Sequence, residues 1–420
     1  ERGLVKSRGR HGGQLLTFSD DVDCLEGDNP PKGRLVVMEF PSMEHVENWW
    51  ADEEYQAASN IRREHSVTNF ICKLEALQPR TEIKVMKITE HYFKSSRHES
   101  FYLAAGKEDD PLIYLIHGWP DLSLGWIKQI SFLAKLGYRV IAPDMRGYGR
   151  STIHQNHSDY CQKEIVKDML ELHSSFTKQK AVWIGHDWGS LVVWNIGLHH
   201  QDKVEALGSL CVPFGWGGHP DSYLDHIDRT LYPKEDYPYG QWDYMYFYYE
   251  NFDLACQQMA EDPYKMIKLN FAKPSEEYKG CFNAGIGAKS MTASIRANGG
   301  WFKHYGFDGL NSIPDVPVDK DLISEDEAVT YGTFLEKNGF FGPNSWYVNG
   351  HLNDQYAKEL QQFTTIDCPV LFIQATYDSV LTKNFNTHNK MVCTNLTERE
   401  VESGHWMARE KPDETNQIIK

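Results

Sequence analysis

An aspartate stands at the centre of the pentapeptide Gly-His-Asp-Trp-Gly at residues 185–189, directly after the apolar run at residues 181–184. The pattern Gly-x-nucleophile-x-Gly is a sharp turn from a strand into a helix, and its glycines relieve crowding where the chain reverses. Serine is the usual central residue, but here Asp187 supplies a carboxylate. Because the turn needs a buried strand before it and a helix after it, the motif predicts an α/β sheet with Asp187 at a strand end.

A carboxylate at this position restricts the chemistry of the site. Its attack on an ester or amide would give a reactive anhydride, whereas its attack on alkyl carbon displaces a leaving group and gives an ordinary alkyl ester on the protein. Hydrolysis of that ester requires a base, a water molecule and donors for the tetrahedral oxyanion. The sequence should therefore contain the residues that supply the base and the donors.

Two backbone N–H groups are expected to form the oxyanion hole. The sequence His-Gly-Trp-Pro at residues 117–120 follows a predicted strand from Leu112 to Ile116, so its loop can direct the N–H of Trp119 toward Asp187. Trp188, the residue after the nucleophile, supplies the second donor. Either motif alone could be an ordinary turn, but together they predict two convergent donors.

The base and its orienting acid are expected late in the chain, because this type of site has the order nucleophile, acid, histidine. His405 lies in Ser-Gly-His-Trp at residues 403–406, and a neutral imidazole there can activate water. Asp378 follows a predicted strand from Val370 to Gln374 and can hold one ring nitrogen of the histidine. An acidic turn residue is the alternative interpretation of Asp378, and the chain order favours the functional one.

These motifs, with Asp-Met-Arg-Gly-Tyr-Gly at residues 144–149, resemble the aspartate-nucleophile α/β hydrolases from about residue 82 onward. That group contains soluble epoxide hydrolases, haloalkane dehalogenases and haloacetate dehalogenases. The resemblance implies an α/β-hydrolase fold with an inserted, mainly helical cap. It also implies that Asp187, Asp378 and His405 act together, without a cofactor or metal.

The leaving group separates the members of this group. A halide needs only N–H donors, while an epoxide oxygen leaves as an alkoxide and needs a proton, which a tyrosine can donate. Residues 242–247 and 339–347 resemble the two cap segments that carry the acid tyrosines of soluble epoxide hydrolases. This resemblance implies that Tyr244 and Tyr347 are the proton-donating pair, with Tyr246 as a rival for Tyr244.

The expected reaction converts a small apolar epoxide to a vicinal diol through an alkyl ester on Asp187. An apolar substrate is expected because the cap segments are rich in aromatic residues. The segments at residues 117–120 and 339–347 also contain His117, Pro120 and Trp346, which are expected to contact the substrate.

Two alternatives remain. A dehalogenase would use the same nucleophile, and the Trp188 indole could bind halide, although epoxide hydrolases share this tryptophan. A haloacetate enzyme would also need arginines for the substrate carboxylate, and the nearest are Arg146 and Arg150, in the loop at residues 144–150. The second alternative is a catalytically silent protein of this fold that serves binding, which the complete set of motifs argues against.

Residues 1–80 differ in pattern from the rest and predict a small α+β module. A turn is expected near residues 26–33, then a strand from Arg34 to Phe40, a helical pattern from Ser42 to Tyr55, and a strand from Val67 to Leu74. Glu-Phe-Pro-Ser, Trp49, Glu-Tyr-Gln and Arg62 resemble a small ferredoxin-like family of unknown function. Members of that family commonly pair into dimeric α/β barrels, so the resemblance implies a homodimer.

The remaining chain is divided by its strand pattern. Buried strands are expected at residues 112–116, 139–142, 181–184, 206–211 and 370–374, with helical patterns between them. This alternation, typical of a parallel sheet, lapses between about Pro213 and Ala357. The expected division is therefore a hydrolase core at 81–213 and 358–420, with a cap at 214–357 over the sheet edge where ligands bind.

Composition argues against other classes of protein. A net charge of -16 disfavours a nucleic-acid partner, and no apolar stretch reaches the ~20 residues of a membrane span. The eight cysteines are scattered without metal-ligand spacing, which favours a reduced protein of the cytoplasm.

Overall fold

The computed structural model describes residues 7–20, 34–65, 67, 71–73, 87–177, 179–215, 219–273, 288–303, 306–360 and 364–420. Contacts between residues divide the chain into two units, Glu1–Lys84 and Val85–Lys420, which are treated separately. The turn expected at residues 26–33 and most of the strand expected from Val67 to Leu74 lie outside the described residues. The described part of that second segment, Val67 and residues 71–73, is not in a strand.

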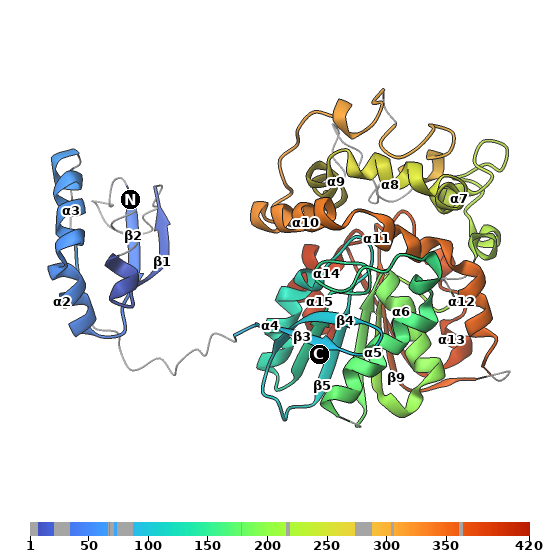
Figure 1. The fold of residues 1–420 in the computed structure, drawn as a ribbon, viewed down its shortest axis with the longest axis horizontal. Helices are drawn as coiled ribbons and strands as arrows, with labels where there is room; N and C mark the ends of the chain where they lie inside the picture. Colours follow the sequence, from blue (N-terminus) through green and yellow to red (C-terminus); the bar gives the residue numbers. More distant parts are fainter. Residues whose placement is uncertain are drawn as a thin grey trace. The chain divides into compact units, whose positions relative to one another are not determined.

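The described residues of the N-terminal unit contain an antiparallel pair of strands, a short helical segment at residues 7–10 and two longer helices (Figure 1). Strand β1 (Gln14–Ser19) pairs with β2 (Leu35–Glu39), and β1 has no counterpart among the strands predicted from the sequence. Helix α2 (Met43–Ala51) begins at the expected cap, because the side chain of Ser42 accepts the N–H of His45.

The helical pattern from Ser42 to Tyr55 is divided into two helices rather than forming one. Asp52 lies between α2 and α3 (Glu53–His65) in an extended conformation. Its Oδ1 accepts the N–H groups of Glu54 and Tyr55 at 3.0 and 3.1 Å, which makes it the cap of α3. The spacing of apolar residues does not reveal this break, because Trp49 and Tyr55 still meet, with ring centroids 4.1 Å apart.

The larger unit is built on an eight-stranded sheet with the order β10-β9-β8-β7-β5-β6-β4-β3. The strands are β3 (Thr89–Lys94), β4 (Glu99–Ala105), β5 (Leu112–Ile116), β6 (Arg139–Pro143), β7 (Ala181–His186), β8 (Val204–Leu210), β9 (Ile366–Ala375) and β10 (Cys393–Val401). Strands β6, β5, β7, β8, β9 and β10 run parallel to one another. Strand β4 runs antiparallel to both of its neighbours, β6 and β3. The predicted fold class is confirmed, but the sheet is mixed rather than wholly parallel.

The five predicted strands, β5 to β9, lie side by side in the parallel part of the sheet. Burial alone does not distinguish them, since β4 is buried at six of its seven positions and was not predicted. All five form, within a few residues of their expected bounds, and β5 and β6 are buried along their whole length. The three strands that the sequence did not indicate are β3, β4 and β10. Edge strands β3 and β10 carry polar residues on their exposed positions, so they lack the continuous apolar run that marks a central parallel strand.

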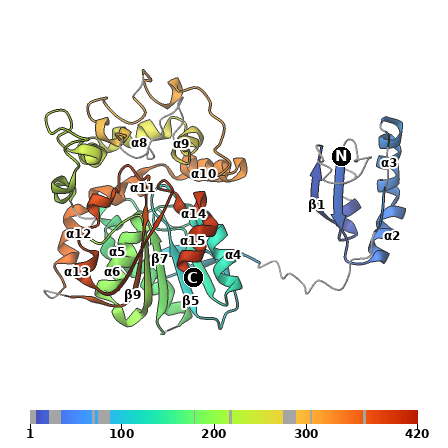
Figure 2. The same cartoon turned by 180° about the vertical axis from the view of Figure 1, so that it is seen from behind.

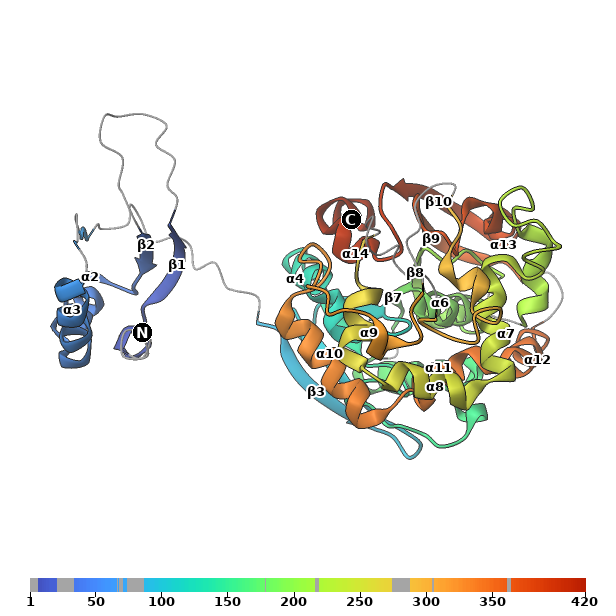
Figure 3. The same ribbon diagram turned by 90° about the horizontal axis from the view of Figure 1, so that it is seen from above.

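Helices cover both faces of this sheet. Helix α6 (Trp188–His199) lies on one face and α4 (Ile127–Lys135) on the other (Figure 3). Helix α5 (Gln162–Phe176) packs against α6, and α15 (Pro412–Ile419) packs against α4. Most of α6 is buried, including Leu191, Val192, Val193 and Ile196, because it packs between the sheet and neighbouring helices.

The chain between β8 and β9 forms the cap. In its described residues it contains helices and no strand, and it lies over the edge of the sheet where the parallel strands end (Figures 1 and 2). Its described α-helices are α7 (Asp243–Glu250), α8 (Phe252–Ala260), α9 (Pro263–Asn270), α10 (Glu325–Asn338), α11 (Phe341–Ser345) and α12 (Gly350–Ala357). This position encloses the end of β7, where Asp187 lies.

Candidate active site

The turn after β7 holds Asp187 in a conformation that few non-glycine residues adopt, with φ 54° and ψ -128°. The adjoining chain approaches very closely. A Cβ on Gly189 would lie 2.1 Å from the carbonyl oxygen of Ile116, and one on Gly118 would lie 2.2 Å from Asp187 Oδ1. Glycine at these two positions therefore lets the loop after β5 reach the aspartate carboxylate.

Two backbone N–H groups donate to the Asp187 carboxylate. The N–H of Trp119 donates to Asp187 Oδ1 at 2.7 Å. Burial raises the pKa of Asp187, and this shift is opposed by the charge of His405 and by hydrogen bonds from the N–H groups of Trp188 and Trp119. Trp188 also begins α6, whose positive end favours the ionised carboxylate.

His405 lies between two carboxylates. Its Nε2 is 3.6 Å from Asp187 Oδ2, and its Nδ1 is 2.7 Å from Asp378 Oδ2. The N–H groups of Val380 and Leu381 donate to the other oxygen of Asp378, each at 2.9 Å. The loops after β7, β9 and β10 thus bring together the nucleophile, acid and base expected from the sequence.

Asp378 and His405 each favour the ionised form of the other. Burial alone would lower the pKa of His405, but the charge of Asp378 and its hydrogen bond raise it well above the ordinary value. Burial alone would raise the pKa of Asp378, but His405 and the two backbone donors lower it. Asp378 therefore remains an anion that can stabilise a protonated imidazole.

Two residues that the sequence did not indicate hold the main chain of His405. His186 Nε2 lies 2.8 Å from the His405 carbonyl oxygen, and the thiol of Cys211 donates to the same oxygen at 3.2 Å. Burial lowers the pKa of His186 to about 3 and raises the pKa of Cys211 to about 11, so both are neutral donors. His186 lies within the elbow motif, but no sequence signal links Cys211 to His405.

A pocket lies between Asp187 and the cap. Most of its lining is apolar or aromatic, and the set includes Leu191, Val212, Trp242, Met245, Val380, Leu381 and Trp406. The polar groups at this lining include Asp187, His405, Tyr244 and Tyr347. Such a lining suits a largely apolar ligand that carries one polar reacting group.

The two cap tyrosines lie together across the pocket from Asp187. The ring centroids of Tyr244 and Tyr347 are 5.7 Å apart, and Tyr347 is also 5.0 Å from the ring of Trp188. Burial raises the pKa of both phenols well above the ordinary value, and the charge of Asp187 raises them further. Both side chains are therefore protonated donors at physiological pH.

Tyr246, the rival for Tyr244, lies elsewhere. Its hydroxyl donates to Asp221 at an exposed position, and its ring packs on Tyr239 with centroids 4.0 Å apart. Helix geometry explains the difference, because residues two apart on α7 point to different sides. Of these two tyrosines, Tyr244 lines the pocket and Tyr246 does not.

The lining of this pocket does not include His117, Pro120 or Trp346, the three residues expected to contact the substrate. His117 is fully buried, accepts the N–H of Met145 at 2.9 Å and lies 2.9 Å from the carbonyl oxygen of Gly118. Trp346 donates its indole N–H to the carbonyl oxygen of Arg146 at 3.1 Å. Pro120 borders a separate small cavity and follows a cis peptide bond. These side chains brace the loops that carry Trp119 and Tyr347.

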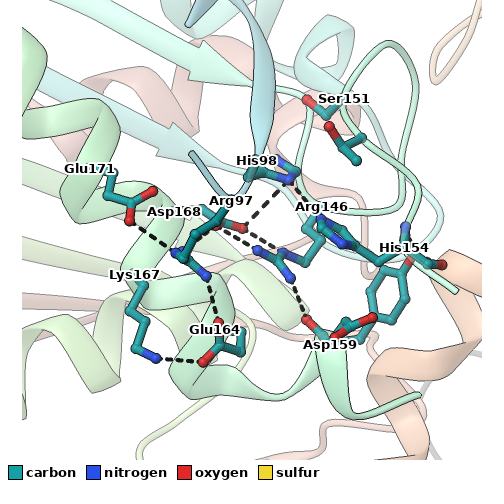
Figure 4. A network of polar contacts seen from close by, with 12 residues as sticks. Arg97, His98, Arg146, Ser151, His154, Asp159, Glu164, Lys167, Asp168 and Glu171 are labelled. Atoms are coloured by element: carbon teal, nitrogen blue, oxygen red, sulfur yellow. Dashed lines mark hydrogen bonds and ion pairs between the residues drawn. The ribbon is translucent and has the colours of Figure 1, made fainter. Parts of the chain in front are cut away.

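Arg146 and Arg150 form ion pairs outside the pocket. Arg146 makes a two-point ion pair with the buried Asp168, at 2.6 and 2.8 Å, and Arg97 donates to the same carboxylate at 2.7 Å (Figure 4). Arg150 pairs with Glu90 at 2.7 Å. Neither arginine lines the pocket, so neither is placed to bind a substrate carboxylate there.

Comparison with known proteins agrees with this geometry. The chain matches the α/β hydrolase fold family over residues 111–412 and a family called domain of unknown function DUF1330 over residues 5–73. It is 30% identical over 333 residues to epoxide hydrolase B of Mycobacterium tuberculosis, covering 74% of this chain and 91% of the relative. It is 29% identical to bifunctional epoxide hydrolase 2 of Sus scrofa, covering 74% of this chain but only 50% of that longer protein.

A solved structure gives the same assignment. Epoxide hydrolase A from Mycobacterium thermoresistibile superposes with a TM-score of 0.64 and 25% identity, covering 79% of this chain and 97% of that one. The chain therefore belongs to the α/β-hydrolase fold family and, within it, to the epoxide hydrolases. Among the described residues, no helix is both long enough and apolar enough to cross a membrane.

Proposed function

We propose that this protein hydrolyses small apolar epoxides to vicinal diols with Asp187 as nucleophile. The observation that carries this proposal is the pair of protonated phenols, Tyr244 and Tyr347, in the same pocket as the elbow carboxylate. An epoxide oxygen needs a proton as its ring opens, and these phenols can supply it. The relatives named epoxide hydrolases support the same reaction.

In the first step, the oxygen of Asp187 that attacks is Oδ2. Its other oxygen, Oδ1, already accepts the N–H of Trp119 at 2.7 Å, which leaves Oδ2 to approach the substrate. A bond forms between Oδ2 and an epoxide carbon, the carbon–oxygen bond of the ring breaks, and Tyr244 or Tyr347 donates a proton to the leaving oxygen. The product is a hydroxyalkyl ester of Asp187.

In the second step, His405 removes a proton from water and the hydroxide adds to the carboxyl carbon of Asp187. Negative charge then develops on Oδ1, which accepts the N–H of Trp119, and the N–H of Trp188, which also bonds to the Asp187 carboxyl group, supplies the second donor. Asp378 stabilises the protonated His405 through the 2.7 Å contact. Collapse of this intermediate breaks the bond between the carboxyl carbon and Oδ2, and His405 returns its proton to the leaving alkoxide oxygen, which gives the diol. The proton of the new carboxyl group restores the tyrosine that donated in the first step, and the new carboxylate oxygen comes from water.

Trapping of the ester tests both the residue and the substrate class. His405→Gln should form the ester but hydrolyse it slowly, so intact-mass spectrometry after mixing with styrene oxide should show a covalent adduct on Asp187. A 1-haloalkane of similar size should give no adduct. An adduct with the haloalkane alone would favour the dehalogenase, and no adduct or diol with either compound would favour a silent protein of this fold.

We further propose a homodimer that forms through the N-terminal unit. Apolar side chains on its sheet support this, because Phe18 and Val36 lie opposite each other in register and are 56% and 44% exposed.

We also propose that the protein lies in the cytoplasm and removes reactive epoxides. The described cysteines are free thiols, as a reducing compartment would keep them.

A further inference from the structure

We propose that Tyr331, with Asp121 and Arg409, forms a buried network that positions the cap for epoxide opening, and that Tyr331 acts through Tyr347. The inference rests on the proposed epoxide hydrolysis. None of the three residues lines the pocket, so each is a positioning residue rather than a catalytic one.

Arg409 is the centre of the network. It is 5% exposed and lies in α14 (Met407–Glu410), four residues after His405. Its Nη1 donates to the carbonyl oxygen of Leu322 at 3.1 Å and to Glu327 at 3.2 Å. Its Nη2 donates to Asp121 at 3.4 Å and to the hydroxyl of Tyr331. One guanidinium therefore links the segment after the catalytic histidine to two parts of the cap.

Asp121 joins the network to the oxyanion loop. Its N–H donates to the carbonyl oxygen of Gly118 at 2.9 Å, which closes the turn that contains Trp119. Its Oδ1 accepts the N–H of Leu122 at 2.9 Å and the hydroxyl of Tyr331. The turn that aims the Trp119 N–H at Asp187 is thus tied directly to a cap side chain.

Tyr331 and Glu327 extend from α10, which is joined to α14 through the hydrogen bonds of Arg409. Helix α10 leads, through Gly339 and α11, into the short helix η8 (Trp346–Val348) that carries Tyr347. The segment from α10 to Tyr347 has a second contact, because the indole N–H of Trp119 donates to Asn344 Oδ1 in α11 at 2.9 Å. The position of Tyr347 over Asp187 therefore depends on how α10 is fixed.

The ionisation states of Asp121 and Tyr331 favour the hydrogen bonds of the network. Burial alone would raise the pKa of Asp121, but the charge of Arg409 lowers it, so Asp121 remains an anion. Burial raises the pKa of Tyr331 well above the ordinary value, so its hydroxyl keeps the proton that it donates to Asp121. Removal of Arg409 would leave Asp121 as a buried charge without its cation, which destabilises proteins strongly, and removal of Asp121 would leave Arg409 with Glu327 alone. Tyr331→Phe removes only the bridging hydroxyl and is the informative variant.

The test compares Tyr331→Phe with Tyr232→Phe in the full-length protein. Tyr232 is an equally buried cap tyrosine at 1% exposure, and its hydroxyl accepts the N–H of Ser290 at 2.8 Å. Tyr331→Phe loses two buried hydrogen bonds, one to Asp121 and one from Arg409, whereas Tyr232→Phe loses one, so both should show a fall in Tm and that of Tyr331→Phe should be the larger. Rapid mixing of excess enzyme with styrene oxide should show ester formation slowed about tenfold or more in Tyr331→Phe alone, because small misplacements of reacting groups have such effects. Ester hydrolysis should change less than twofold.

A double-mutant cycle tests the route through Tyr347. In a Tyr347→Phe background, adding Tyr331→Phe should slow ester formation little further, because the group that it positions is already absent. Fully additive effects would overturn that route. Equal rates of ester formation in wild type and Tyr331→Phe would overturn the positioning role itself. Both outcomes require an active wild type, whereas a wild type that forms neither ester nor diol refutes the proposed function instead.

Discussion

At the scale of single residues, the two oxygens of Asp187 have different tasks. Oδ1 accepts the N–H of Trp119 at 2.7 Å, and Oδ2 lies 3.6 Å from His405 Nε2. The first is placed to carry negative charge during ester hydrolysis, and the second is left to attack. The same donors thus bind the carboxylate before the reaction and the oxyanion later.

The tyrosine variants test the proton donors. Tyr244→Phe and Tyr347→Phe should each slow ester formation by about 100-fold, since a positioned general acid contributes roughly that much, and the double variant should be slower still. Ester hydrolysis should be nearly unchanged in all three. Tyr246→Phe is the control, because its hydroxyl binds Asp221 instead. A rate in Tyr246→Phe as low as in Tyr244→Phe would contradict the assignment.

The pH dependence tests the charge on His405. Ester hydrolysis needs neutral His405, so its rate should fall as pH drops through the pKa that Asp378 raises. In Asp378→Asn this raising charge is lost, so the acid limb should move to lower pH while the maximal rate decreases. Because the pKa values of Tyr244 and Tyr347 are raised, no alkaline limb from these phenols is expected below about pH 10. Single-turnover rates across pH measure both features, and an acid limb that Asp378→Asn leaves in place would contradict the account.

At the scale of elements, the turn between β7 and α6 depends on close backbone approach. A Cβ at Gly189 would lie 2.1 Å from the Ile116 carbonyl oxygen, which is backbone and cannot rotate away. Gly189→Ala should therefore lower the free energy of unfolding by about 2 kcal/mol or more. At Gly208 the nearest atom is a side-chain carbon of Ile184 at 3.2 Å, so Gly208→Ala should cost less. Denaturant unfolding of both variants measures the difference, and equal losses would count against this explanation.

The same scale shows what sequence could predict. Buried strands such as β5 and β7 were predictable because their apolar runs are continuous, whereas the edge strands β3 and β10 alternate with polar residues. The elbow, His405 and Asp378 could be proposed because motifs and chain order locate them. Contacts made only in three dimensions had no such signal, as with Cys211 beneath His405 or Arg409 against the cap.

At the scale of the whole molecule, the N-terminal unit should be separable from catalysis. Contacts divide the chain after Lys84, and every residue assigned to the site lies in the unit Val85–Lys420. A chain of residues 85–420 should therefore keep the turnover of styrene oxide within about twofold. It should also sediment as a monomer if the N-terminal units join the dimer. A truncated chain that sediments as the same oligomer as the full-length protein would contradict the proposed dimer contact.

The central claim about the whole enzyme is that the oxygen added to the epoxide comes from Asp187 and is replaced from water. A single turnover of excess enzyme with styrene oxide in ¹⁸O-labelled water measures this directly. The account predicts an unlabelled diol and one ¹⁸O in the peptide that contains Asp187, detected by mass spectrometry after digestion. A labelled diol with an unlabelled Asp187 peptide would show direct attack of water on the epoxide and would contradict the account.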